Sequence, residues 1–312
     1  PTRHGVRRQR QMCIRDRFGS PGPGKDDGYI PAETEVSVSA TGSGHQANVF
    51  QFIHRVANGE NVNISDELGE RFRLASDSIL NTLYTEARDV ARAIATGLRA
   101  EGFLTPDGTP LPADYFLNLI EGQDQSPSDL SLLRLTHCRA MQLDERNLAG
   151  CTMSHTDLNA FTILPAPTKE GLQIWYEDKT SPENSGWVQL DAPSDKFAYI
   201  VNFADQMEIT TGSFLRSTPH RVVSPIGEDR YSIILFVGFQ RDIALAESKL
   251  THASGMDTSR FEIEATARMP GTPLTAQSFT DLRKFDIGLI PRDVAVDQLK
   301  FVPIDRIRQD GV

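Results

Sequence analysis

The chain has 312 residues, which is long enough to bury a sizeable core. Its 32 Lys and Arg residues against 42 Asp and Glu residues give a net charge of -10, a balance that argues against nucleic acid or an anionic membrane surface as partner. Three cysteines form no disulfide or zinc framework, and no apolar run reaches the ~18 residues that a membrane span needs. We therefore expect a cytoplasmic protein without nucleic-acid or membrane partners.

The N-terminal segment departs from this acidic balance. Six arginines and one aspartate lie within the first 17 residues, and a Gly/Pro-rich stretch follows at 19–24. The run from Met12 to Arg17 resembles a translated sequencing-adapter remnant. We predict that residues 1–27 are a disordered or artefactual N-terminus.

Helical periodicity dominates the next part of the chain. Residues 47–60 and 65–102 are predicted to be helical, most clearly from Asp77 to Gly102, where apolar residues recur at helical spacing and a glycine ends the pattern. A second helix is predicted from Pro112 to Glu121. These helices are expected to support a sheet and to carry no catalytic group.

After a polar loop at 122–129 the hydrophobic period becomes two. The short strands predicted there are 130–138, 161–164, 172–177, 187–190, 197–203, 207–211, 220–223 and 231–239. Turn residues separate them, and many short strands at regular intervals are typical of a sandwich or jelly roll. Residues 243–312 are expected to mix helix and loop.

His155, Asp157 and His220 are the candidate metal ligands. The first two form a His-x-Asp motif, and His220 follows 65 residues after His155. Two imidazoles and one carboxylate on one side of an octahedron leave three positions open, as expected of non-haem Fe(II) oxygenases. Zinc accepts the same ligands, and an isolated His-x-Asp is common on protein surfaces. The triad alone therefore does not identify the metal.

Arg230 and Ser232 are candidates for binding a carboxylate. Positions i and i+2 of a strand share a face, so the guanidinium and the hydroxyl point the same way. The planar fork of arginine suits a carboxylate better than lysine does. The alternative for Arg230 is a structural salt bridge with Glu228 or Asp229.

In this order and spacing, these residues resemble the 2-oxoglutarate/Fe(II) dioxygenases, in their isopenicillin N synthase-like branch. The similarity covers roughly residues 130–242. Besides the residues named above, it runs through Phe161–Leu164, Gly171–Ile174, Trp187–Val188, Val201–Asp205, Thr211–Gly212 and Ser217–Val222.

The resemblance implies a mainly β fold with flanking helices. Its core would be a double-stranded β-helix, a distorted jelly roll, over residues 131–242. Residues 28–130 would be a truncated helical N-terminal region, and residues 243–312 a C-terminal helix and loop extension packed on the core.

The resemblance also implies an activity, namely oxidation, chiefly hydroxylation, of a small-molecule substrate by a monomeric enzyme. The cofactors would be Fe(II) held by the triad, 2-oxoglutarate as co-substrate held by Arg230 and Ser232, O₂, and ascorbate to maintain Fe(II). Succinate and CO₂ would be released.

The sequence departs from the family at two places. Asn159 stands where a glycine is common, and asparagine tolerates the left-handed backbone that such a turn needs. Arg134–Cys138 replaces the plant motif Arg-Leu-Asn-Tyr-Tyr, so the tyrosine that often assists 2-oxoglutarate is missing. Either His137 replaces it as a donor, or Arg230 and Ser232 hold 2-oxoglutarate alone.

The substrate is expected at the open mouth of the barrel. By position, the candidates to line this mouth are Thr136, Phe161, Arg216 and Phe239. For Phe161 and Phe239 a place in the core is the commoner role, and Arg216 is equally consistent with a solvated strand position. None of the four identifies a substrate.

Two rival functions remain at this point. The missing tyrosine keeps open an Fe(II) oxidase of the isopenicillin N synthase or aminocyclopropanecarboxylate oxidase type, which does not consume 2-oxoglutarate. A non-catalytic module that binds iron or a carboxylate is the other alternative, although such a module has no reason to keep all three metal ligands.

Overall fold

The computed structural model describes four short strands before residue 56 and most of residues 67–303. The gaps in the second range are 123–124, 141–151, 192–197, 224–226, 287–289, 291–293 and 296–298. The prediction for residues 1–27 lies outside the described residues. None of the helices in the described part is both long and apolar enough to cross a membrane.

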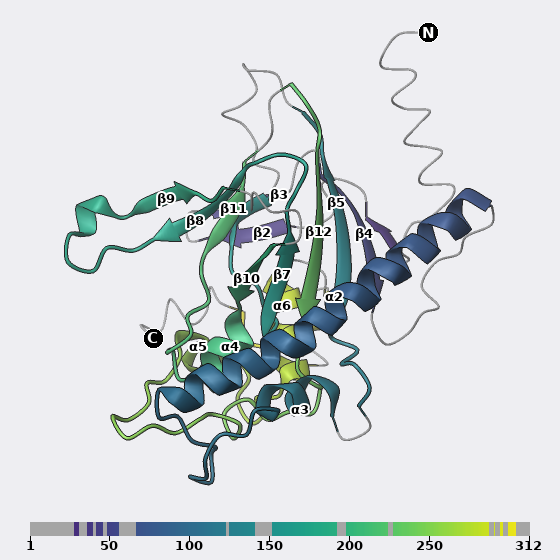
Figure 1. The fold of residues 1–312 in the computed structure, drawn as a ribbon. Coiled ribbons are helices and arrows are strands. Elements are labelled where there is room, and N and C mark those ends of the chain that lie inside the picture. Colours follow the sequence, from purple (N-terminus) through teal and green to yellow (C-terminus); the bar gives the residue numbers. More distant parts are fainter. Residues whose placement is uncertain are drawn as a thin grey trace, which may run out of the picture.

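Two antiparallel sheets form the centre of the molecule (Figure 1). The larger has the order β1-β4-β5-β12-β7-β10 and comprises Gly28–Ile30, Val49–Arg55, Leu132–Cys138, Arg230–Val237, Phe161–Pro165 and Tyr199–Phe203. The smaller has the order β6-β11-β8-β9 and comprises Thr152–His155, His220–Val222, Leu172–Tyr176 and Gly186–Gln189. A separate hairpin joins β2 (Val36–Ser39) and β3 (Gly42–His45). The mainly β fold with flanking helices was thus correctly predicted.

The long helix α2 (Glu67–Ala100) crosses the larger sheet in Figure 1, with α3 (Tyr115–Glu121) below its lower half. Its buried stripe recurs every three or four residues and is made of Leu80, Leu83, Ala87, Ala91, Ala95 and Leu98. The alanines are almost fully buried, because small side chains bring the helix backbone close to its neighbours. Gly102 follows the helix with φ +91°, a conformation that favours glycine and lets the chain leave the helix.

Two predicted elements were wrong. Residues 49–55, expected within a helix, form β4, which pairs along its whole length with β5. The hydrophobic period of this segment is ambiguous, because it mixes β-branched, aromatic and polar residues. Pairing with β5 therefore determines that the segment is a strand. Residues 207–211, expected as a strand, lie mostly in the short helix α4 (Asp205–Thr210). All six residues of α4 are buried, so no polar face marks it as a helix.

The region after residue 242 packs on the barrel through two helices. They are α5 (Arg260–Arg268), which lies beside α4 in Figure 1, and α6 (Ala276–Asp286), which lies at the lower end of β7. Phe261, Phe279 and Leu282 bury this region in the same core as the sheet residues Phe161 and Leu235. A short 3₁₀ turn, Pro182–Asn184, connects β8 to β9.

Candidate active site

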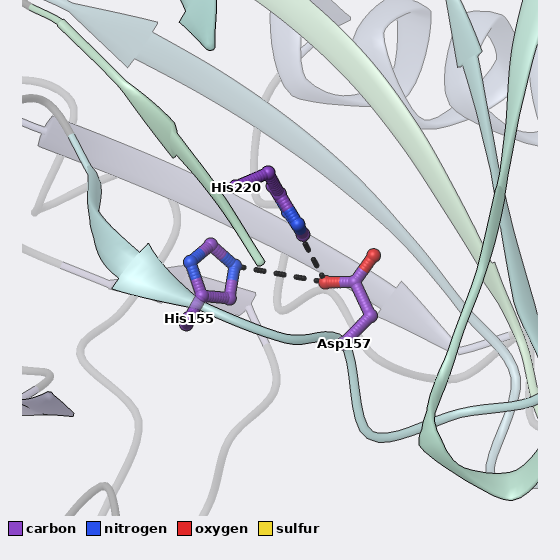
Figure 2. Close-up of side chains that lie close together, drawn as sticks. All are labelled: His155, Asp157 and His220. Carbon is purple, nitrogen blue, oxygen red and sulfur yellow. Dashed lines mark ion pairs between the residues drawn. The ribbon is translucent and has the colours of Figure 1, made fainter. Parts of the chain in front are cut away.

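The side chains of His155, Asp157 and His220 converge on one point, as Figure 2 shows. Their ligand atoms all lie within 4.8 Å of one another. Nε2 of His155 and Nε2 of His220 are each 3.6 Å from Oδ1 of Asp157. A single small cation could be reached from all three side chains.

Strand pairing brings these ligands together from distant parts of the chain. His155 ends β6 and His220 begins β11, and the two histidines are cross-strand partners. Asp157 follows in the loop after β6, where its carbonyl oxygen accepts a 2.9 Å hydrogen bond from the backbone N–H of Asp205. Antiparallel strand pairing therefore brings His155 and His220 together although they are 65 residues apart, and the loop after β6 places Asp157 beside them.

The carboxylate of Asp157 is oriented by two donors. Its Oδ2 atom accepts hydrogen bonds from the Thr162 hydroxyl at 2.7 Å and from the Asn202 amide at 2.9 Å. Oδ1 remains directed at the histidines. Burial alone would raise the pKa of Asp157, but His220, His155 and the Thr162 hydroxyl outweigh it and lower that pKa. The group is thus an ionised ligand at neutral pH.

His220 is held as a neutral imidazole. Its Nδ1 lies 3.1 Å from the carbonyl oxygen of Thr218, so Nδ1–H donates to that oxygen and Nε2 keeps its lone pair toward Asp157. Burial and the nearby His155 lower the pKa of His220. A neutral imidazole with its second nitrogen bonded to the backbone is the usual form of a metal-bound histidine. The donor set therefore fits a divalent transition metal.

Asp205 connects the two loops that carry the ligands. Its carboxylate accepts hydrogen bonds from Ser217 at 2.6 Å and from Thr156 at 3.3 Å, and Arg283 of α6 pairs with it at 3.4 Å. Burial raises the pKa of Asp205 to about 6, against the opposing effect of Arg283. Asn202 thus contacts the ligand Asp157 directly, whereas Asp205 contacts the residues beside the ligands.

Arg230 begins β12 of the larger sheet. Its side chain is buried, with Nη1 donating to the Ser232 hydroxyl at 3.0 Å and Nε to the carbonyl oxygen of Lys169 at 3.0 Å. The acids that could have formed a structural salt bridge have other partners: Glu228 pairs with Lys169, and Asp229 with His137.

The cavity that contains these groups lies between the two sheets. The larger sheet contributes Arg134, Thr136, Cys138, Thr162, Leu164, Arg230, Ser232, Ile234 and Phe236, and the smaller sheet with its following loop contributes Thr152, His155, Asp157, Leu172, His220 and Val222. The metal-ligand triad and the Arg230–Ser232 pair thus open into one space. A ligand could contact both at once.

Comparison with known proteins agrees with this geometry. The family model described as the 2OG-Fe(II) oxygenase superfamily matches residues 132–239, which span the triad and the Arg230–Ser232 pair. Residues 132–239 form a 2OG-Fe(II) oxygenase domain. The larger sheet extends beyond this domain, because β1 and β4 precede it in sequence.

Curated relatives match parts of the chain. The proline hydroxylase buaE of Petromyces alliaceus is 35% identical over 144 residues, 43% of this chain and 41% of that protein. The gibberellin 2-beta-dioxygenase of Phaseolus coccineus is 32% identical over 111 residues, 35% of this chain and 31% of that protein. The chain spans less than half the length of these relatives.

Solved structures of oxygenases share the fold. The crystal structure of JOX2 in complex with 2OG, Fe and JA superposes with a TM-score of 0.58 at 20% identity, over 90% of this chain and 71% of that one. The predicted double-stranded β-helix core is confirmed.

Some of the predicted residues do not line the cavity of the oxygenase domain. His137 lies on the opposite face of β5 from Thr136; it pairs with Asp229 at 2.8 Å and stacks on Tyr231. The alternation of a strand thus directs His137 away from the space in which we expected it to act, and this geometry does not support contact with 2-oxoglutarate.

Phe161 and Phe239 are fully buried in the hydrophobic core and do not line the cavity. The prediction that they line the mouth of the barrel was therefore wrong. Arg216 is exposed and lies 3.7 Å from Glu177, outside the cavity lining. Thr136 does line the cavity, and it hydrogen-bonds the Ser232 hydroxyl. It therefore lies beside the Arg230–Ser232 pair.

Sequence interpretation missed Thr162, Arg134 and Arg283. The sequence did indicate a site role for Thr162, since it is a polar residue on the face of β7 opposite Phe161. Arg283 had none, because only packing of α6 brings it to Asp205. Asn159 does not adopt a left-handed conformation. Its amide instead hydrogen-bonds the carbonyl oxygens of Phe161 and Val237.

Proposed function

We propose that this chain is a 2-oxoglutarate-dependent Fe(II) dioxygenase of the isopenicillin N synthase-like branch that hydroxylates a small molecule. One observation carries the proposal. An oriented His/Asp/His triad and a buried Arg–Ser pair line the same cavity. A metal-assisted hydrolase has no need of a carboxylate-binding pair beside its metal.

His155, Asp157 and His220 would hold Fe(II), and Arg230 with Ser232 would hold the distal carboxylate of 2-oxoglutarate. When bound, iron and co-substrate supply the oxidation, consuming O₂ and releasing succinate and CO₂, with ascorbate to maintain Fe(II). A buried carboxylate without a cationic partner would be destabilised by several kcal/mol, which is why a buried arginine at this place supports a co-substrate site.

The remaining side chains would orient and shield the site. Thr162 and Asn202 orient the Asp157 carboxylate toward the histidines, and Thr136 hydrogen-bonds the Ser232 hydroxyl. The apolar side chains of Leu164, Leu172, Val222 and Ile234 line the cavity and reduce access of water to it. The protein's contribution is thus binding, orientation and exclusion of solvent.

The decisive experiment is an anaerobic titration of the Fe(II)-loaded protein with 2-oxoglutarate, which follows the visible metal-to-ligand charge-transfer band. We expect a saturable band in wild type and its loss in His155→Ala and Asp157→Ala, which cannot hold iron. Arg230→Ala should keep iron and lose 2-oxoglutarate affinity. Arg230→Lys should recover only part of that affinity, because lysine lacks the bidentate fork.

Arg73→Ala is the matched control, since Arg73 is a surface arginine of α2 that pairs with Glu70 and Asp77. Wild-type protein that binds iron but shows no band would contradict the proposal. Substrate-triggered O₂ uptake without 2-oxoglutarate would favour the oxidase branch, and ligand binding without turnover would favour a binding module.

We further propose that the protein is a cytoplasmic monomer that binds neither nucleic acid nor membrane. Its acidic composition supports the last two points. Light scattering of the purified chain tests the monomer, and fractionation of expressing cells tests the location.

A further inference from the structure

An apolar strip runs outward from the metal ligands along the smaller sheet. It consists of Ile174 and Tyr176 on β8 and Val188 on β9. Ile174 is the direct cross-strand partner of His220, and Val188 is in turn the partner of Ile174. Directly opposed residues of antiparallel strands share a face and have Cβ atoms roughly 5 Å apart. Because His220 lines the cavity, the strip begins beside a metal ligand on the cavity side of the sheet.

The outer part of the apolar strip is open to solvent. Tyr176 is 52% exposed and Val188 is 46% exposed. The residue opposite Tyr176 is Gly186, which has no side chain to cover the ring, and a Cβ atom added there would meet nothing within 4 Å. Figure 1 shows β8 and β9 projecting from the barrel as a hairpin. Single exposed apolar residues are common, but these two adjoin each other and continue a row that starts at the metal ligands.

The reverse face of the hairpin is held together by aromatic contacts. Trp175 and Trp187 are cross-strand partners, and their rings meet edge to face with centroids 5.5 Å apart. The guanidinium carbon of Arg221 on β11 lies 4.2 Å from the centroid of the Trp187 ring, and Nε of Arg221 donates to the Gln173 side chain at 2.8 Å. These contacts join β11, β8 and β9 on one side of the sheet. The apolar strip on the other side is therefore preformed, which reduces the entropy lost when a ligand binds.

We propose that the apolar strip binds the substrate, so that the enzyme selects elongated small molecules with an apolar body. The inference rests on the proposed function. The substrate carbon that is oxidised would lie at the metal, beside His220. Neighbouring strands are about 4.8 Å apart, so a substrate that reaches from β11 to Val188 on β9 extends ~10 Å. Covering the exposed side chains of the strip removes apolar surface from water, which favours an apolar body over a polar one.

The test measures how affinity depends on the length of an apolar ligand. Protein loaded with Mn(II) and 2-oxoglutarate is titrated calorimetrically, under anaerobic conditions, with butanamide, hexanamide and octanamide. In wild type the affinity should rise with chain length, and octanamide should bind with a negative heat-capacity change, the marker of buried apolar surface. Val188→Ser should weaken octanamide binding about tenfold, the lower end of what a lost methylene costs in an apolar pocket. Butanamide should bind both proteins equally, because it is too short to reach Val188.

Three controls separate the possible failures. Ile263→Ser removes an aliphatic side chain that is 53% exposed on α5, away from the apolar strip, and should keep the wild-type affinity for octanamide. Val188→Ile retains an apolar side chain on the strip and should also keep that affinity. The charge-transfer titration with 2-oxoglutarate should give the same affinity in Val188→Ser as in wild type, which also shows that the variant is folded.

Equal octanamide affinity in Val188→Ser and wild type would overturn the inference. An equal loss in Ile263→Ser would indicate adsorption to the surface at large and would overturn it too. A wild type that binds 2-oxoglutarate but does not prefer the longer amides would also overturn it, leaving the proposed function intact. If wild type did not bind 2-oxoglutarate at all, the proposed function itself would fail.

Discussion

The hydrogen bond from Thr162 to Asp157 offers the sharpest test of how the site is built. The Thr162 side chain is buried, and its hydroxyl lies 2.7 Å from Oδ2 of Asp157. Thr162→Val removes the hydroxyl and keeps the shape of the side chain. Asn202 still donates to the same oxygen at 2.9 Å, so the carboxylate keeps one of its two donors.

Two independent scales give the size of the effect. Hydrogen bonds to charged groups are worth about 1.5–3 kcal/mol, and loss of a partner behind a metal ligand weakens metal binding by about 10- to 100-fold. These ranges agree, because a tenfold change corresponds to about 1.4 kcal/mol. We expect the lower end, about tenfold, since Asn202 continues to orient the carboxylate.

The assay is an anaerobic Fe(II) or Mn(II) titration of the apoprotein, with Thr82→Val as control. Thr82 is exposed on α2, where its hydroxyl bonds the carbonyl oxygen of Ser78. Metal affinity should fall in Thr162→Val, remain unchanged in Thr82→Val, and fall further when Asn202→Leu is added to Thr162→Val. Equal metal affinity in Thr162→Val and wild type, with both folded, would refute the idea that this hydroxyl orients the ligand.

Three further predictions test other parts of the structure. Arg283→Ala should weaken metal binding, because Arg283 pairs with the Asp205 carboxylate that joins both ligand loops. This effect is expected although α6 lies outside residues 132–239. A metal titration unchanged from wild type would contradict it. Phe239→Ala should lower the free energy of unfolding by about 3–5 kcal/mol, measured by urea denaturation, and should leave 2-oxoglutarate affinity of the folded protein unchanged, since Phe239 is a core residue. Burial would raise the pKa of Asp229, but the Ala140 N–H and His137 outweigh it and lower that pKa. The contribution of Asp229 to stability is therefore present above its unfolded pKa and is lost as pH falls through the lowered, folded value. Urea titrations of the metal-free protein should therefore show Asp229→Asn to be less stable than wild type at neutral pH, with the difference disappearing in acid; a difference that grows in acid would reverse the sign.

Much of this protein could be predicted from sequence because its chemistry depends on residue order. The His-x-Asp motif and the Arg-x-Ser pair are short local patterns, and strand alternation directs Arg230 and Ser232 to one face. Most of the strands after residue 130 and the long helix were predicted for the same reason. Their alternation and helical spacing reflect one buried face.

The tertiary structure decided which neighbours each residue meets. Residues 49–55 became a strand because β5 offered an unpaired edge, and residues 205–210 became a helix although burial removed any polar face. His137 lies outside the cavity because pairing of β5 with β12 brings it to Asp229 and Tyr231. Arg134 and Arg283 reach the site through contacts across the fold, with Phe236 and Asp205 respectively. A sequence pattern records which residues share a local face, whereas the contents of a cavity depend on contacts between segments distant in the chain, which no local period encodes.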